Sequence, residues 1–112
     1  MKRKTIRNHR DFYVSPNDIS VWCELFVVKA KPAKIYGDAR YGIIVTKRSF
    51  KHAVDRNRAK RVMRDWIAFN EDLMIPDFDY VFIPRVGVLD AERDIGRANI
   101  GKLLNKISKK NQ

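Results

Sequence analysis

The amino-acid sequence predicts an α/β (α+β) domain, a two-layer sandwich in which helices pack on one sheet. The 112 residues fit a single domain that can bury a hydrophobic core. Residues 19–30 and 41–46 are rich in the apolar residues that strands favour. In residues 53–69 and in the C-terminal segment, the apolar residues recur at the spacing of a helix. The expected order is a short helix, strands, a helix, a strand and a final helix.

The first half of the chain is expected to supply most of the sheet. Residues 1–10 form a basic, flexible arm, and residues 11–14 form a short helical turn that Pro16 ends. Residues 19–30 are rich in aromatic and β-branched residues and predict one strand, and residues 41–46 predict a central strand. On the first strand, one face would carry Val21, Cys23, Leu25 and Val27, and the other Trp22, Glu24, Phe26 and Val28.

A long helix is expected from Ala53 to Phe69. At about 100° per residue, one arc holds Ala59, Val62, Met63, Trp66, Phe69 and Asn70, and apart from Asn70 these residues are expected to face the core. The adjoining arc comprises Arg56, Asn57, Lys60, Arg61 and Arg64, while Arg58 projects on the far side. Like charges on neighbouring helical positions repel, so this concentration of cations favours binding to a polyanion over the alternative of a solvated charged face.

The last third of the chain predicts a turn, a strand and a helix. Pro76 and Asp77 form the turn, residues 79–84 form the strand, and Asp90 is placed to cap the final helix. The buried stripe of that helix is expected to comprise Ile100, Leu103, Leu104 and Ile107. Residues 109–112 are expected to fray at the end of a domain that spans residues 1–112.

The charge of the chain indicates its class of partner. It holds 24 Lys and Arg against 13 Asp and Glu, a formal net charge of +11, and it concentrates eight of the cations between Lys47 and Arg64. Such a field attracts nucleic acid. No apolar run is long enough to cross a membrane, the N-terminus has no apolar signal segment, and the single Cys23 excludes an internal disulfide. The expected location is the cytoplasm.

Catalysis by the protein alone has little support in the sequence. His9 and His52 lack neighbouring Cys or His residues that would complete a zinc site, and no Gly-rich phosphate loop or nucleophile motif is present. Asp77 and Asp79 could hold Mg²⁺ together, although a turn after Pro76 explains Asp77 more simply. Two further classes of protein stay open on these grounds: a structural RNA-binding module such as a ribosomal protein, and a small metal-dependent nuclease.

Four segments together resemble one known family. Residues 53–61 (AVDRNRAKR) are similar to the RNR signature of the bacterial ribonuclease P protein subunit. Residues 40–48 (RYGIIVTKR) and 79–85 (DYVFIPR) resemble the strands that flank this signature, and residues 10–12 (RDF) resemble the family's N-terminal segment. These segments occur in the family's order over most of the chain.

The resemblance implies a noncatalytic subunit that joins a catalytic RNA and helps it remove the 5′ leader from precursor tRNA. The RNA would perform the hydrolysis with Mg²⁺ held by RNA and substrate, and not by a protein site. The implied RNA-binding residues are Arg56, Asn57, Arg58, Lys60, Arg61, Arg64, Lys47, Arg48 and Lys51. The implied leader cleft has Phe12 as its wall and Phe26 and Val28 as its floor. The implied fold has a mostly antiparallel sheet and a left-handed βαβ crossover, against the usual right-handed rule.

Overall fold

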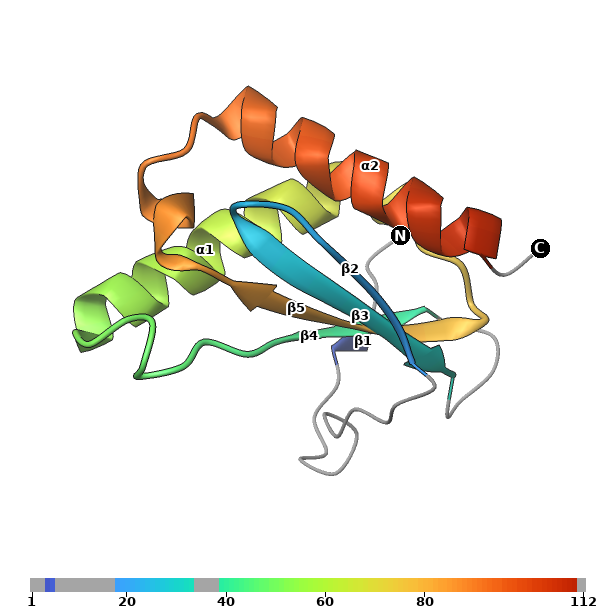
Figure 1. Ribbon diagram of the computed structural model, residues 1–112, viewed down its shortest axis with the longest axis horizontal. Helices are drawn as coiled ribbons and strands as arrows, with labels where there is room; N and C mark the ends of the chain where they lie inside the picture. Colours follow the sequence, from blue (N-terminus) through green and yellow to red (C-terminus); the bar gives the residue numbers. More distant parts are fainter. Residues whose placement is uncertain (1–3, 6–17, 34–38, 111–112) are drawn as a thin grey trace.

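The computed structural model describes residues 4–5, 18–33 and 39–110 of the chain. In this part, two long helices cover the same face of a five-stranded sheet (Figure 1), which confirms the predicted α/β class. The elements are β1 (Lys4–Thr5), β2 (Ile19–Trp22), β3 (Phe26–Pro32), β4 (Arg40–Ile43), α1 (Ala53–Phe69), η2 (Glu71–Leu73), β5 (Phe78–Pro84), η3 (Val86–Leu89) and α2 (Arg93–Lys110). The predicted helical turn at 11–14 and most of the predicted arm lie outside the described residues.

The strands are arranged in the order β1-β4-β5-β3-β2. β3 is antiparallel to both β2 and β5, whereas β4 is parallel to both β1 and β5. Most of the paired residues lie in the two antiparallel ladders, which agrees with the mostly antiparallel sheet that was expected. β4 and β5 are parallel because α1 returns the chain from the end of β4 to the start of β5. β1 belongs to the arm that was expected to be flexible, and its two residues instead pair with the edge of β4.

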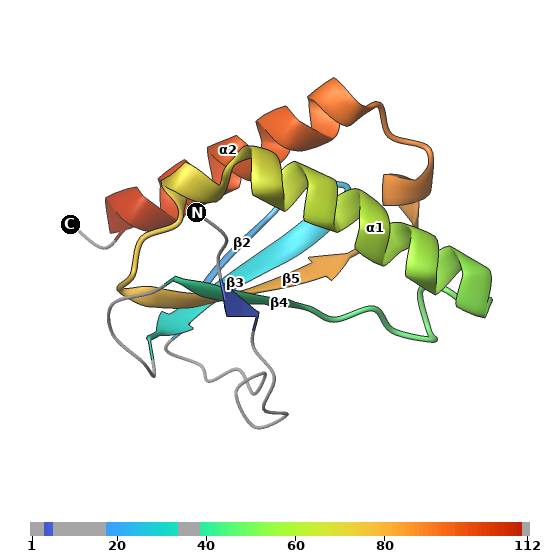
Figure 2. The same cartoon turned by 180° about the vertical axis from the view of Figure 1, so that it is seen from behind.

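The β4–α1–β5 connection has the left-handed crossover that the resemblance implies. The two strands are parallel neighbours, and α1 lies on the helical side of the sheet (Figure 1, Figure 2). When the sheet is viewed from the helices with both strands pointing upward, β5 lies to the left of β4. Most such connections are right-handed, so hydrophobic periodicity could not have predicted this hand.

The predicted single strand over residues 19–30 is wrong, because the chain reverses in its middle. β2 and β3 form an antiparallel hairpin in which Trp22 pairs with Val27. The Cys23 N–H donates to the carbonyl oxygen of Phe26 at 3.0 Å and closes the turn. Residues 23–25 contain no Gly, Pro or Asn, so the sequence carries no ordinary turn signal there. The reversal changes which residues share a face: Phe26 lies on the helical side, and Trp22 lies on the opposite side with Val27.

Helix α1 begins and ends where its periodicity predicts. Its buried residues are Ala59, Met63, Trp66 and Ile67. Phe69, expected in the core, is 64% exposed, and Asn70 is buried. The Asn70 side-chain amide donates to the carbonyl oxygens of Trp66 and Arg97, at 2.9 and 2.8 Å. This pair of hydrogen bonds holds the end of α1 against α2 and satisfies a polar group that would be costly to bury alone.

Helix α2 begins at Arg93, so Asp90 is not its cap as predicted. The first helical hydrogen bond runs from the Gly96 N–H to the Glu92 carbonyl oxygen at 3.0 Å, which moves the cap position to Glu92. The predicted core stripe is confirmed, since Ile100, Leu103, Leu104 and Ile107 are all buried. The helix continues through Lys110, so the first two residues of the predicted frayed end are helical. Within the described ranges, no helix has an apolar stretch long enough to span a membrane.

The two helices approach each other closely where Gly96 faces Trp66. A Cβ atom on Gly96 would overlap the indole ring, so a larger residue does not fit. Across the same contact, the Arg97 guanidinium pairs with Asp65 at 3.0 Å and lies 4.4 Å from the centre of the Phe69 ring. These contacts fix the rotation of α1 about its axis, and with it the direction of its polar face.

Candidate nucleic-acid interface

One side of α1 and the loop before it form a cationic area, called the basic surface below. It comprises Lys47, Arg48, Lys51, Arg56, Arg58, Lys60, Arg61 and Arg64. Arg56 and Lys60 are half-buried, and the other six are exposed. None of the eight forms an ion pair with another described residue. The predicted spacing is confirmed, because Arg56, Lys60 and Arg64 follow one line along α1 at intervals of four residues.

The loop that carries the first three cations has a fixed shape. Its Phe50 side chain is 2% exposed and belongs to the hydrophobic core. The Phe50 N–H donates to the Thr46 carbonyl oxygen at 3.0 Å, and the Ser49 N–H donates to the Thr46 hydroxyl oxygen at 3.2 Å. These contacts form a compact turn that presents Lys47 and Arg48 to solvent.

Arg56 joins this loop to the helix. Its Nη1 donates to the carbonyl oxygens of Phe50 and Lys51, at 2.9 and 3.1 Å. One edge of the guanidinium is therefore engaged with the protein's own backbone, and the remaining N–H groups are available to a phosphate. Sequence reasoning identified Arg56 only as an RNA ligand, because a hydrogen bond to a preceding loop leaves no periodic signal.

Arg58 and Asn57 differ from their neighbours. The Arg58 Nη2 donates to the Leu89 carbonyl oxygen at 3.3 Å, which ties this exposed side chain to the end of η3. Asn57 is exposed beside the cations and makes no side-chain hydrogen bond with the described residues. Its amide can both donate and accept, so it remains compatible with a contact to a base or a ribose.

The predicted floor of the leader cleft is buried. Phe26 and Val28 are fully buried on the helical face, and the Phe26 ring lies 6.3 Å from that of Trp66. A ligand on the surface cannot reach them in this structure. Phe12, the predicted wall, lies outside the described residues.

The opposite side of the sheet, called the far face below, carries other candidates. No described helix covers it (Figure 1). Trp22, Val27 and Ile83 are paired across β2, β3 and β5 and form an apolar row there. Trp22 is 64% exposed, and Val27 and Ile83 are partly exposed. Lys29 lies two residues along β3 on the same face, so this face combines an exposed aromatic ring with a cation.

The two aspartates considered for Mg²⁺ do not form an open pair. Asp79 is fully buried, and its carboxylate accepts hydrogen bonds from Arg40 Nε at 3.1 Å and Arg40 Nη2 at 2.6 Å. Asp77 is exposed in the turn before β5. Among the described residues, no three His, Cys, Asp or Glu side chains converge as metal ligands would. The arrangement removes the feature on which the metal-dependent nuclease depended.

Comparison with known proteins agrees with this geometry. A family model described as Ribonuclease P matches residues 1–108. The chain belongs to the ribonuclease P protein family. It is 35% identical over 105 residues to the ribonuclease P protein component of Lactobacillus delbrueckii subsp. bulgaricus, and the match covers 93% of this chain and 87% of that protein. The corresponding protein of Idiomarina loihiensis is 35% identical over 74 residues, which cover 66% of this chain and 58% of that protein.

Solved ribonuclease P proteins share the fold. The protein from Thermotoga maritima superposes with a TM-score of 0.76 at 29% identity, over 94% of this chain and 98% of that one. The protein from Staphylococcus aureus gives a TM-score of 0.74 at 27% identity, over 96% and 97% of the two chains. Membership in the ribonuclease P protein family assigns the chain to tRNA 5′ processing as a component of ribonuclease P, an endoribonuclease complex, and implies an RNA partner.

Proposed function

We propose that this protein binds the catalytic RNA of ribonuclease P through the basic surface and holds the 5′ leader of precursor tRNA on the far face of its sheet. The observation that carries the proposal is the basic surface itself, in which none of the eight cations is paired with a described acid. Unpaired Lys and Arg side chains on a rigid helix can neutralise several backbone phosphates at once.

The position of the loop supports a continuous path between the two surfaces. The Ile44 N–H donates to the Phe82 carbonyl oxygen at 2.9 Å, so the chain leaves the sheet just before the cations at Lys47 and Arg48. The apolar row of Trp22, Val27 and Ile83 lies at the same end of the sheet, since Ile83 follows Phe82 directly. A single strand of RNA could therefore place its phosphates near the loop and its bases against the row.

The leader is the part of the substrate that suits the far face. Exposed aromatic rings stack on unpaired bases with little regard for sequence. Lys29 is placed to attract the phosphates of such a strand. In this proposal Trp22, Val27 and Lys29 replace Phe26 and Val28 as the residues that contact the leader, and Phe12 keeps its proposed place beside them.

The chemistry in this proposal belongs to the RNA, which holds Mg²⁺ together with the substrate. The protein acts by neutralising crowded phosphates and by keeping the leader extended. We place the complex in the cytoplasm, where a reducing environment suits the unpaired Cys23 thiol.

The leader contact is tested by measuring the affinity of the reconstituted complex for precursor tRNA and for mature tRNA, which lacks the leader. Trp22→Ala removes one stacking ring, which is worth about 1–3 kcal/mol per base, so affinity for the precursor should fall by about 5- to 150-fold while affinity for mature tRNA stays unchanged. Phe69→Ala is the matched control, because both rings are 64% exposed and Phe69 lies on α1. Equal losses for both tRNAs, or equal effects of both variants, would contradict the leader contact.

The division of labour has its own test. Purified protein with Mg²⁺ should leave precursor tRNA intact, and addition of the catalytic RNA should produce the mature 5′ end. Asp79→Asn is not informative for this purpose, because it breaks the buried pair with Arg40 and so affects folding. Cleavage by the protein without any RNA would overturn the assignment of chemistry to the RNA.

A further inference from the structure

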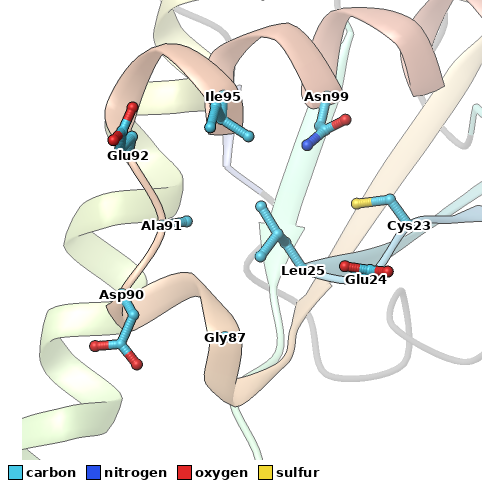
Figure 3. Close-up of a pocket in the computed structure, with 9 residues that line it drawn as sticks. All are labelled: Cys23, Glu24, Leu25, Gly87, Asp90, Ala91, Glu92, Ile95 and Asn99. Carbon is cyan, nitrogen blue, oxygen red and sulfur yellow. The ribbon is translucent and has the colours of Figure 1, made fainter.

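A pocket of about 490 Å³ lies between the β2–β3 turn, η3 and the start of α2 (Figure 3). Its floor is apolar, with Leu25, Ala91 and Ile95 facing one another. Ile95 is 52% exposed at the edge of this floor. The proposed RNA contacts use none of these residues.

Acidic residues lie at separate points along the edge of this apolar floor. Glu24 comes from the hairpin turn on one side, and Asp90 and Glu92 come from the segment before α2 on the other (Figure 3). None of the three forms an ion pair with another described residue, although the chain has a net charge of +11 and an excess of cations. The residues that line the pocket include no Lys, Arg or His.

The negative charge of the pocket lining is opposite in sign to the net charge of the chain, and it decides the class of partner. Three unpaired carboxylates repel the phosphates of RNA and attract a cation. The apolar floor favours an occupant that carries an uncharged aliphatic group beside the cation. A solvated metal ion has no such group, and in a polyamine every methylene run lies between two charged nitrogens. A Lys or Arg side chain next to a Leu, Ile or Val in a protein segment meets both requirements, since its long stem is apolar and its head is charged.

We propose that this pocket is a docking site for a basic segment of a protein partner, which inserts an aliphatic side chain over Leu25 and Ile95 and places a Lys or Arg head at the edge of the pocket beside Glu92. The site would let the protein contact another protein while the basic surface holds RNA. It is independent of the leader contact, because the two use different faces of the hairpin.

The probe is an acetylated, amidated four-residue peptide that alternates leucine and arginine, titrated into the full-length ¹⁵N-labelled chain. Saturable shifts of the backbone amides of Leu25, Gly87 and Ile95 are expected. A leucine–glutamine peptide and a serine–arginine peptide are the matched probes, and each should bind several-fold more weakly. If the serine–arginine peptide binds equally well, the pocket is only an acidic surface and the proposal fails.

Two variants distinguish binding in the pocket from general attraction of the peptide to acidic residues. Glu92→Gln should weaken the leucine–arginine peptide by roughly two- to fivefold, the range for one exposed ion pair. Asp72→Asn removes the same charge at an exposed position outside the pocket and should have no effect. Equal affinities of the two variants would overturn the proposal, as would peptide shifts confined to the basic surface. A dimer detected by sedimentation that Glu92→Gln abolishes would assign the pocket to a second copy of the chain and refute the proposed partner.

Discussion

Replacement of Arg61 by alanine should make RNA binding less dependent on salt. Arg61 is exposed on the basic surface and makes no side-chain hydrogen bond with the described residues, so its guanidinium is available to a phosphate. Each phosphate that a protein neutralises contributes about −0.7 to −0.9 to the slope of log affinity against log salt. If all eight cations contact phosphates, the basic surface alone gives a slope of about −6 to −7.

Arg61→Ala should therefore reduce the magnitude of the slope by about 0.7–0.9. Between 50 and 200 mM salt, the affinity ratio of the natural protein to the variant should then shrink by about threefold. The assay is equilibrium binding of the catalytic RNA over this range of salt, followed by fluorescence anisotropy. Arg61→Lys keeps the charge and should keep the slope. Any loss of its affinity then measures the loss of the planar guanidinium.

Lys102→Ala is the matched control, because Lys102 is exposed on α2 and removes one positive charge elsewhere on the protein. Its slope should equal that of the natural protein. Parallel salt dependence of Arg61→Ala and the natural protein would show that Arg61 does not contact a phosphate, and would refute the argument drawn from the exposed arc of α1.

Two predictions concern stability, measured by urea denaturation. Gly96→Ala should lower the free energy of unfolding by about 1–3 kcal/mol, because the added methyl group overlaps the Trp66 ring. Gly101→Ala is the control and should lower it less, because the nearest atom to the added Cβ is 3.0 Å away. Equal losses for the two variants would show that α2 shifts to relieve the overlap. Arg40→Met should lower it by about 3–5 kcal/mol, since Asp79 would keep a buried charge without its guanidinium, and joint replacement with Asp79→Leu should restore most of the loss. A double variant no more stable than the single one would argue against this cause.

Periodicity predicted the central helix well and its surroundings less well. The bounds of α1 and the line of Arg56, Lys60 and Arg64 follow from local spacing, which a helix converts directly into direction. Phe69 was predicted wrongly because its surroundings form only when α2 packs across α1. Asn70 is then buried with its amide donating to the Arg97 carbonyl oxygen, and the Arg97 guanidinium lies over the exposed Phe69 ring. That contact is between residues distant in sequence and leaves no local pattern.

The faces of residues 19–30 were predicted wrongly for a different reason. A three-residue turn without Gly, Pro or Asn interrupts an otherwise uniform run, and one missed turn exchanges the faces of every later residue in the strand. Trp22 and Phe26, expected on one face, therefore lie on opposite faces, the first exposed and the second buried. The resemblance to a family supplied the hand of the crossover, which depends on topology, whereas burial had to come from the structure.

The hydrogen bonds of Arg56 to the backbone of Phe50 and Lys51 affect how selective the protein can be. Flexible lysine tails adjust to any polyanion, including heparin or unfolded RNA. Here the Arg56 guanidinium attaches the loop to the helix, so the backbone positions that carry the cations of the loop and of the helix stay at fixed distances from one another. This fixed spacing should favour polyanions whose folded form presents phosphates at matching intervals, so we expect the basic surface to select by shape as well as by charge.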